Sequence, residues 1–111
     1  MANYTGAVLA RHKTFTTTNA DLCEFAQTID AVTVVNRDGT NTLYFNVNSA
    51  TVPVAAADDL FVLLPNQSMT VPVPPVPSGV TPGATAGKQC VRLVGSAGGW
   101  SVMARQSWSA A

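Results

Sequence analysis

The chain has 111 residues, of which six are basic and six are acidic, so its formal net charge is zero and charged side chains make up only 11%. This length predicts one domain with a single modest core. Binding nucleic acid by neutralising phosphates needs clustered Lys and Arg, and the balanced, sparse charge argues against such a role. A protein with so little charge tends to associate, which favours a surface covered by partners.

The first twenty residues predict an N-terminal arm or an edge strand. They carry no clear core signal beyond Val8, Leu9 and Phe15, and Arg11, His12 and Lys13 form a basic, exposed tripeptide. No basic region is followed by an apolar signal core, and no apolar run approaches the ~20 residues that a transmembrane helix needs. We therefore expect a chain that is made in a cytoplasm and has no contact with a membrane.

The next elements are a short helix and a hairpin. Residues 19–26 have the only helix-like start in the chain and predict a turn or two of helix. Two β-type runs, residues 32–35 and 42–47, then flank Asp38 and Gly39. Because Gly accepts the positive φ of a tight turn, this pattern predicts a hairpin.

From there to the C-terminus the hydrophobic pattern has a period of two. Apolar and polar residues alternate over residues 43–48, 68–73, 90–94 and 100–105. The run 60–64 is apolar on both faces and predicts a strand in the middle of a sheet, covered on both sides. Residues 96–99 predict a second hairpin. The fold predicted is all-β, an antiparallel sandwich or small barrel, jelly-roll or immunoglobulin-like, of about seven or eight strands with extended termini.

This domain is expected to span residues 21–105, followed by a C-terminal tail at 106–111. A long loop at 74–88, rich in Pro and Gly, interrupts it. Its prolines cannot donate a full ladder of hydrogen bonds, so we expect either a contact arm or a flexible insertion.

Catalytic and metal-binding patterns are weak, so we expect no enzyme, no metal site and no cofactor. His12 is the only histidine, and no glycine-rich phosphate loop opens a helix. Asp58 and Asp59 form the only adjacent carboxylate pair, either a cation site or a polar loop. Cys23 and Cys90 are two buried thiols, a disulfide pair or, as a third alternative, catalytic or metal-binding groups.

Partner contact is the remaining role for exposed aromatic, basic and proline residues. Tyr44 falls on the polar face of its strand, and Trp108 lies in a charge-free tail. Trp108 either anchors in a neighbour's pocket, stacks on a sugar or folds back over its own core. The candidate contact residues are Tyr4, Arg11, Lys13, Tyr44, Pro74, Pro75, Pro77 and Trp108.

Three segments, VTVVNRDGT (32–40), DLFVLLP (59–65) and VRLVG (91–95), resemble small β-sandwich structural proteins of tailed bacteriophage particles. The likeness covers residues 30–105 and lies in the general pattern of strands and turns, with no invariant motif. It implies a non-enzymatic capsid decoration or accessory protein in the virion. Such a protein binds the major capsid protein or other virion subunits at subunit boundaries and forms a homo-oligomer, for which a trimer is expected.

Two other functions stay open. A tail or tail-tip binding module would bind a carbohydrate, a receptor or Ca²⁺ through Tyr44, Trp108 and residues 58–59. A thiol or hydrolytic enzyme would require a lowered pKa at Cys23 or Cys90.

Overall fold

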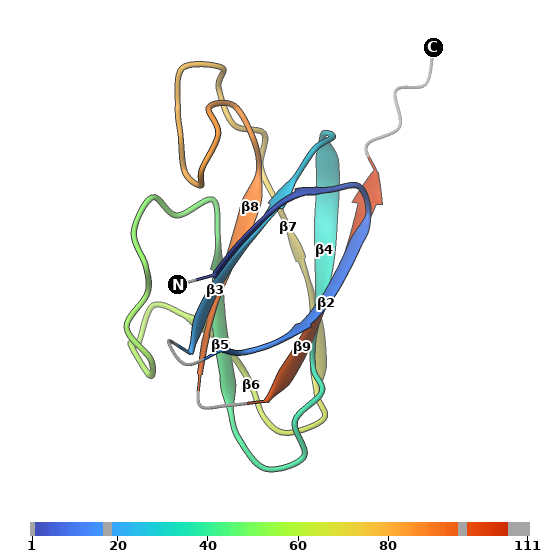
Figure 1. Cartoon of the computed structure of the whole chain (residues 1–111), viewed down its shortest axis with the longest axis vertical. Coiled ribbons are helices and arrows are strands. Elements are labelled where there is room, and N and C mark those ends of the chain that lie inside the picture. Colours follow the sequence, from blue (N-terminus) through green and yellow to red (C-terminus); the bar gives the residue numbers. More distant parts are fainter. Residues whose placement is uncertain (1, 17–18, 96–97, 107–111) are drawn as a thin grey trace.

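The computed structural model describes residues 2–16, 19–95 and 98–106, and these ranges form nine strands in two packed sheets (Figure 1). The five-stranded sheet has the order β1 (Ala2–Ala7), β3 (Ala20–Phe25), β8 (Cys90–Gly95), β5 (Leu43–Val47) and β6 (Phe61–Leu63). The four-stranded sheet has the order β2 (Ala10–Thr14), β9 (Gly99–Gln106), β4 (Ile29–Asn36) and β7 (Ser68–Pro72). The predicted all-β sandwich is confirmed, with slightly more strands than expected.

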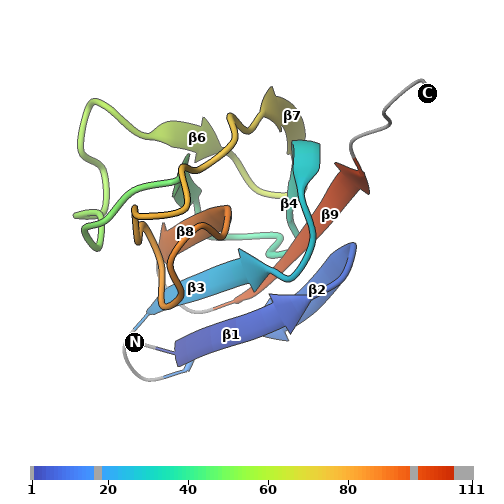
Figure 2. The ribbon, with the colours of Figure 1, turned by 90° about the horizontal axis from the view of Figure 1, so that it is seen from above.

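The two sheets lie face to face, as the view from above shows (Figure 2). Neighbouring strands are antiparallel, except that β1 runs parallel to β3. The core between the sheets contains the largest buried side chains, Phe25, Phe45 and Trp100. Fully burying one large apolar side chain contributes roughly 1.5–3 kcal/mol. The alternation in residues 43–47 and 100–102 predicts the inward positions correctly, because Leu43, Phe45, Trp100 and Val102 are all buried.

Both predicted hairpins are wrong, since the chain changes sheet where a hairpin was expected. β4 pairs with β7 and β9, whereas β5 pairs with β6 and β8. β8 and β9 likewise belong to different sheets. Packed sheets lie ~10 Å apart, a distance that a two-residue turn cannot bridge.

Polar side chains within the connection from β4 to β5 fix its conformation by hydrogen bonds. Asp38 Oδ2 accepts a hydrogen bond of 2.8 Å from the Asn41 side chain, and its Oδ1 accepts one of 2.8 Å from the Thr40 amide. Asn36 Nδ2 donates to the carbonyl oxygens of Asn41 and Leu63, at 2.8 and 3.1 Å. The side chain at the end of β4 is therefore tied to the end of β6.

Two further predictions about strands are wrong. Residues 19–26, predicted as a helical turn, contain β3, in which every residue is buried. A strand covered on both faces shows no period of two, so the cap-like residues at its start were the only local signal, and they favoured a helix. The apolar run 60–64, predicted as a central strand, contains β6, which is an edge strand with exposed Phe61 and Val62.

Candidate interaction surface

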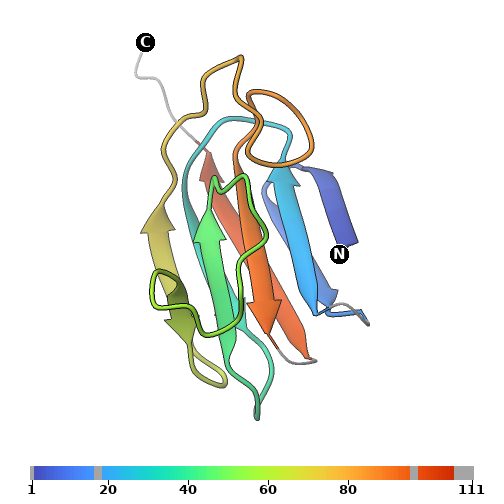
Figure 3. The same cartoon turned by 90° about the vertical axis from the view of Figure 1, so that its left-hand side faces the viewer.

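Two loops of the same chain, residues 48–60 and 73–89, lie over part of the outer face of the five-stranded sheet (Figure 3). Arg92 is buried beneath both loops. Its Nε donates a 2.6 Å hydrogen bond to the Ser49 carbonyl, and Nη2 donates one of 2.9 Å to the Pro82 carbonyl. The Arg92 guanidinium therefore connects both loops, 48–60 and 73–89, to β8.

Glu24 fixes the long loop at its far end. The buried Oε2 atom accepts hydrogen bonds from the backbone amides of Ala84 and Thr85, at 2.8 and 2.9 Å. Gly83 leaves room for this contact, since a Cβ atom at that position would lie 2.7 Å from Glu24 Oε2. The loop is therefore anchored to its own sheet at Ala84 and Thr85.

Gln89 fixes the base of the same loop. Its side chain accepts a hydrogen bond of 2.8 Å from the Ile29 amide. It also donates hydrogen bonds to the carbonyls of Ile29, Val73 and Pro74, at 2.9 to 3.1 Å. Because Gln89 is buried, these bonds satisfy a polar group that would otherwise destabilise the core.

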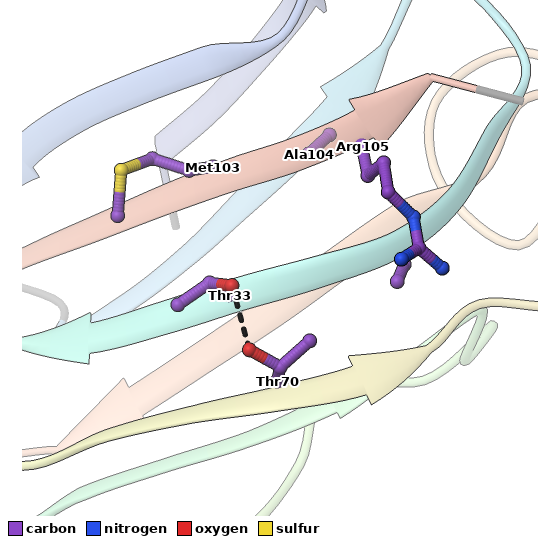
Figure 4. Close-up of a pocket in the computed structure, with 6 residues that line it drawn as sticks. Thr33, Thr70, Met103, Ala104 and Arg105 are labelled. Atoms are coloured by element: carbon purple, nitrogen blue, oxygen red, sulfur yellow. Dashed lines mark hydrogen bonds between the residues drawn. The ribbon is translucent and has the colours of Figure 1, made fainter.

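No described segment covers the outer face of the four-stranded sheet. The strand registers place alternate residues on this side, and we call them the open face: Ala10, His12, Thr14, Ala31, Thr33, Val35, Ser68, Thr70, Pro72, Ser101, Met103 and Arg105. Small residues on β4 leave a shallow hollow between β9 and β7, bordered by Met103, Arg105 and Thr70 (Figure 4).

The chemistry of the open face suits a protein partner. Two of its residues, His12 and Arg105, are ionisable, and the Arg37 guanidinium lies against Gly99 at one end of β9. Covering most of this face therefore removes few charges from water. The hydroxyls of Thr33 and Thr70 share a 2.7 Å hydrogen bond and keep further hydrogen-bonding capacity for a neighbour. Met103 is 40% exposed and provides a flexible apolar contact at the centre.

His12 and Ser101 lie side by side on this face and share a hydrogen bond of 2.8 Å between Nδ1 and Oγ. A serine nucleophile requires an accessible hydroxyl and a third group that orients the histidine. Ser101 is buried, and no carboxylate in the described ranges bonds to His12. The pair therefore links β2 to β9 and lacks the arrangement that activates a serine.

Three predicted contact residues gather where β1 and β2 form one side of the sandwich, but they face inward. Tyr4 packs against Trp100, with ring centroids 5.9 Å apart, and Lys13 Nζ lies 5.0 Å from the Tyr4 ring centre. Arg11 Nη2 donates a 3.1 Å hydrogen bond to the Thr5 carbonyl. In the basic tripeptide, His12 is exposed, whereas Arg11 and Lys13 are half-buried.

The other predicted contact residues lie elsewhere. Tyr44 is half-buried on β5, separated from β1 by two strands, or about 14 Å at the usual strand spacing. Pro74, Pro75 and Pro77 are exposed in the long loop. Trp108 lies outside the described residues. The structure therefore does not unite the predicted contact residues in one patch.

The carboxylate pair at Asp58 and Asp59 is exposed in the loop before β6. Across the part of the chain that the structure describes, no three His, Cys, Asp or Glu side chains are grouped to hold a metal ion. The same part contains no helix that is long and apolar enough to cross a membrane.

The two cysteines are free, buried and placed on opposite faces of one sheet. Cys23 faces the core, whereas Cys90 lies under the long loop, one register position away on the next strand. Burial raises the pKa of the Cys23 thiol to about 12 and that of Cys90 to about 11. Thiol catalysis requires a lowered pKa, and both shifts have the opposite sign.

Sequence reasoning missed the groups that organise these surfaces. Asp21, Glu24 and Arg92 all stand in runs that look apolar, and each is buried with a specific partner. Trp100 Nε1, for example, donates a 2.8 Å hydrogen bond to Asp21 Oδ2 across the two sheets. The sequence does contain a signal for them, namely a charged residue within a run that is expected to be buried. Such a residue is almost never fully buried unless it is paired.

Comparison with protein-family models gives no match to this chain, and comparison with curated proteins gives no significant match either.

Proposed function

We propose that this chain is a non-enzymatic structural protein of a tailed-bacteriophage particle, which decorates the capsid and reinforces boundaries between its subunits. The observation that carries the proposal is the open face: a broad sheet surface with few charged side chains and no covering segment among the described residues. On the opposite sheet, two loops are fixed against the outer face by hydrogen bonds to the buried side chains of Glu24 and Arg92. This asymmetry is expected if one face docks on a particle and the other meets solvent.

The partner in this proposal is the major capsid protein or another virion subunit. Thr, Ser and Ala side chains allow close approach and hydrogen bonding, and Met103 supplies the central apolar contact. The resemblance to decoration proteins also gives a homo-oligomer, with a trimer expected, as part of the proposal.

Two matched substitutions test the docking face. Met103→Lys places a cation in the open face, and Val80→Lys places one on the long loop over the opposite sheet. The two side chains have similar exposure, 40% and 50%. Purified chain is mixed with particles assembled without it, and the bound fraction is measured by co-sedimentation.

The proposal predicts that Met103→Lys weakens binding at least about tenfold, because burying an unpaired charge costs more than ~1.4 kcal/mol. Val80→Lys should bind like the wild type. Equal binding by both variants, or loss with Val80→Lys alone, would contradict the assignment of the open face.

The second candidate is a phage tail or tail-tip module that binds a carbohydrate or receptor. A shallow depression beside the loop 48–60 favours it, because Asn46, Ser49, Thr51 and Asp59 supply polar groups next to Val52 and Val54. Thermal stabilisation by added oligosaccharide or Ca²⁺, lost in Asp59→Asn, would support this candidate; no shift with either would count against it.

A further inference from the structure

Arg105 is the charged side chain that borders the hollow in the open face. The hollow has a volume of about 240 Å³ and is lined by Ala31, Thr33, Thr70, Met103, Ala104 and Arg105. The exposed side chain of Arg105 extends from β9 across β4 (Figure 4). None of the described residues that line the hollow is acidic, and Asp30, the only carboxylate on β4, is not among them. The guanidinium therefore has no opposite charge within this hollow.

Thr33 and Thr70 supply hydroxyl groups to the same hollow (Figure 4). Their oxygen atoms lie 2.7 Å apart and share one hydrogen bond. The two hydroxyls have two protons, and this bond uses one of them, so the other can be donated to a ligand. The hollow therefore offers a guanidinium and a hydroxyl donor to one bound group.

The remaining lining suits a short aliphatic chain. Ala31 pairs with Arg105 in the strand register, and its methyl group leaves space beside the longer side chain. Met103, two residues earlier on β9, is 40% exposed and can pack against methylene groups. A group with an aliphatic stem and an anionic, hydrogen-bond-accepting end fits this combination.

We propose that the hollow binds the side-chain carboxylate of an Asp or Glu residue on the protein that docks on the open face. The Arg105 guanidinium pairs with the carboxylate, because its fork of N–H donors matches the two carboxylate oxygens. The free hydroxyl proton of the Thr33 and Thr70 pair is donated to the same carboxylate. This inference rests on the proposed docking function and names the chemistry that the partner must present.

Docking itself makes an acidic partner necessary. β9 lies between β2 and β4, so a protein that covers the open face also covers Arg105. A cation that is removed from water without a partner is strongly destabilising, whereas a paired and hydrogen-bonded one is tolerated. The surface that covers Arg105 therefore has to supply an anion.

A single carboxylate fits better than a polyanion such as nucleic acid. Arg37 is the other guanidinium at β9, and it already donates hydrogen bonds to the carbonyls of Lys13 and Trp100, at 2.9 and 3.1 Å. It lies against Gly99, six residues from Arg105 along β9, or ~20 Å. Phosphate chains are bound by clustered cations, and these two are widely separated.

An amine introduced at position 105 tests the contact directly. Arg105→Lys keeps the positive charge and adds a primary amine, which a carbodiimide couples to a carboxylate in contact with it. Val80→Lys is the control, since it adds an amine to the long loop over the opposite sheet at a residue that is 50% exposed. Each variant is mixed with particles assembled without the chain and treated with carbodiimide, and cross-linked peptides are identified by mass spectrometry. We expect Arg105→Lys to be joined to an Asp or Glu of one virion subunit in at least about tenfold higher yield than Val80→Lys.

Two neutral variants measure what the charge contributes to binding. Arg105→Gln and Lys88→Gln each remove one positive charge, and Lys88 lies in the long loop over the opposite sheet. In co-sedimentation, Arg105→Gln should bind at least about tenfold more weakly than the wild type, and Lys88→Gln should bind like it.

Equal cross-linking of the two lysine variants would overturn the inference. Equal binding by Arg105→Gln and Lys88→Gln would also overturn it, and if Met103→Lys still weakened binding, the docking face itself would stand. If the wild-type chain does not bind the particles, the docking function and this inference fail together.

Discussion

Replacing Glu24 with Ala should release the long loop from the five-stranded sheet. The substitution removes the acceptor of two backbone hydrogen bonds, from Ala84 and Thr85, at 2.8 and 2.9 Å. A hydrogen bond to a charged group contributes about 1.5–3 kcal/mol, but water replaces part of it here, because both donor residues are exposed. We therefore expect Glu24→Ala to lower the free energy of unfolding by about 2 kcal/mol, below the sum of two such bonds.

Urea denaturation at neutral pH measures this loss, and amide hydrogen exchange locates it. Ala84 and Thr85 should be protected in the wild type and should exchange rapidly in Glu24→Ala. The exposed carboxylate of Asp59 provides the control, and Asp59→Ala should change stability by less than about 0.5 kcal/mol. If the two variants are equally stable, or if the amides of Ala84 and Thr85 exchange freely in the wild type, the loop is not held by Glu24.

Three further outcomes follow from buried groups. Gly83→Ala should destabilise by about 1–3 kcal/mol in the same urea assay and expose the same loop amides, because its Cβ would lie 2.7 Å from Glu24 Oε2; wild-type stability would contradict this contact. Burial raises the pKa of Asp21 above 3.8, so the stability gained from its bound proton is present at low pH and is lost as pH rises through the folded pKa. Asp21→Asn cannot ionise, so its stability relative to the wild type should increase as pH rises from 3.8 toward neutrality, and a decrease would contradict the shift. Because their pKa values are raised, Cys23 and Cys90 should react with iodoacetamide slowly in the folded chain and fully in urea. Rapid labelling of the folded chain would contradict this and would support the alternative of a thiol enzyme.

The sequence predicts the inward faces of several strands because one side of each meets the core. Leu43, Phe45 and Val102 follow this rule. It fails at β3, where both faces are covered and the period disappears. It fails again at β6, whose apolar residues indicate a covered strand but lie at an open edge.

Connectivity was the least predictable part of the fold. Gly39 and residues 96–99 have the composition of hairpin turns, yet the flanking strands lie in different sheets. Local turn chemistry shows that the chain bends, but long-range pairing decides which strand it joins. The pairing of β4 with β7 and β9 has no signature in the residues between β4 and β5.

The candidate surfaces were predictable only in part. Low charge indicated a covered surface, but the sequence could not show which sheet its own loops protect. That depends on Glu24 and Arg92, which meet their loop partners only after folding. The expected contact residues Tyr4, Arg11 and Lys13 turn inward because β1 and β2 place them beside Trp100 and the core.

Quantitative mass spectrometry of the purified particle tests the central claim most directly, by counting copies of this chain against the most abundant shell protein. A capsid decoration protein should be present in copy numbers comparable to the shell protein. A handful of copies would instead point to a tail or connector component. Absence of the chain from the particle would contradict the virion function altogether.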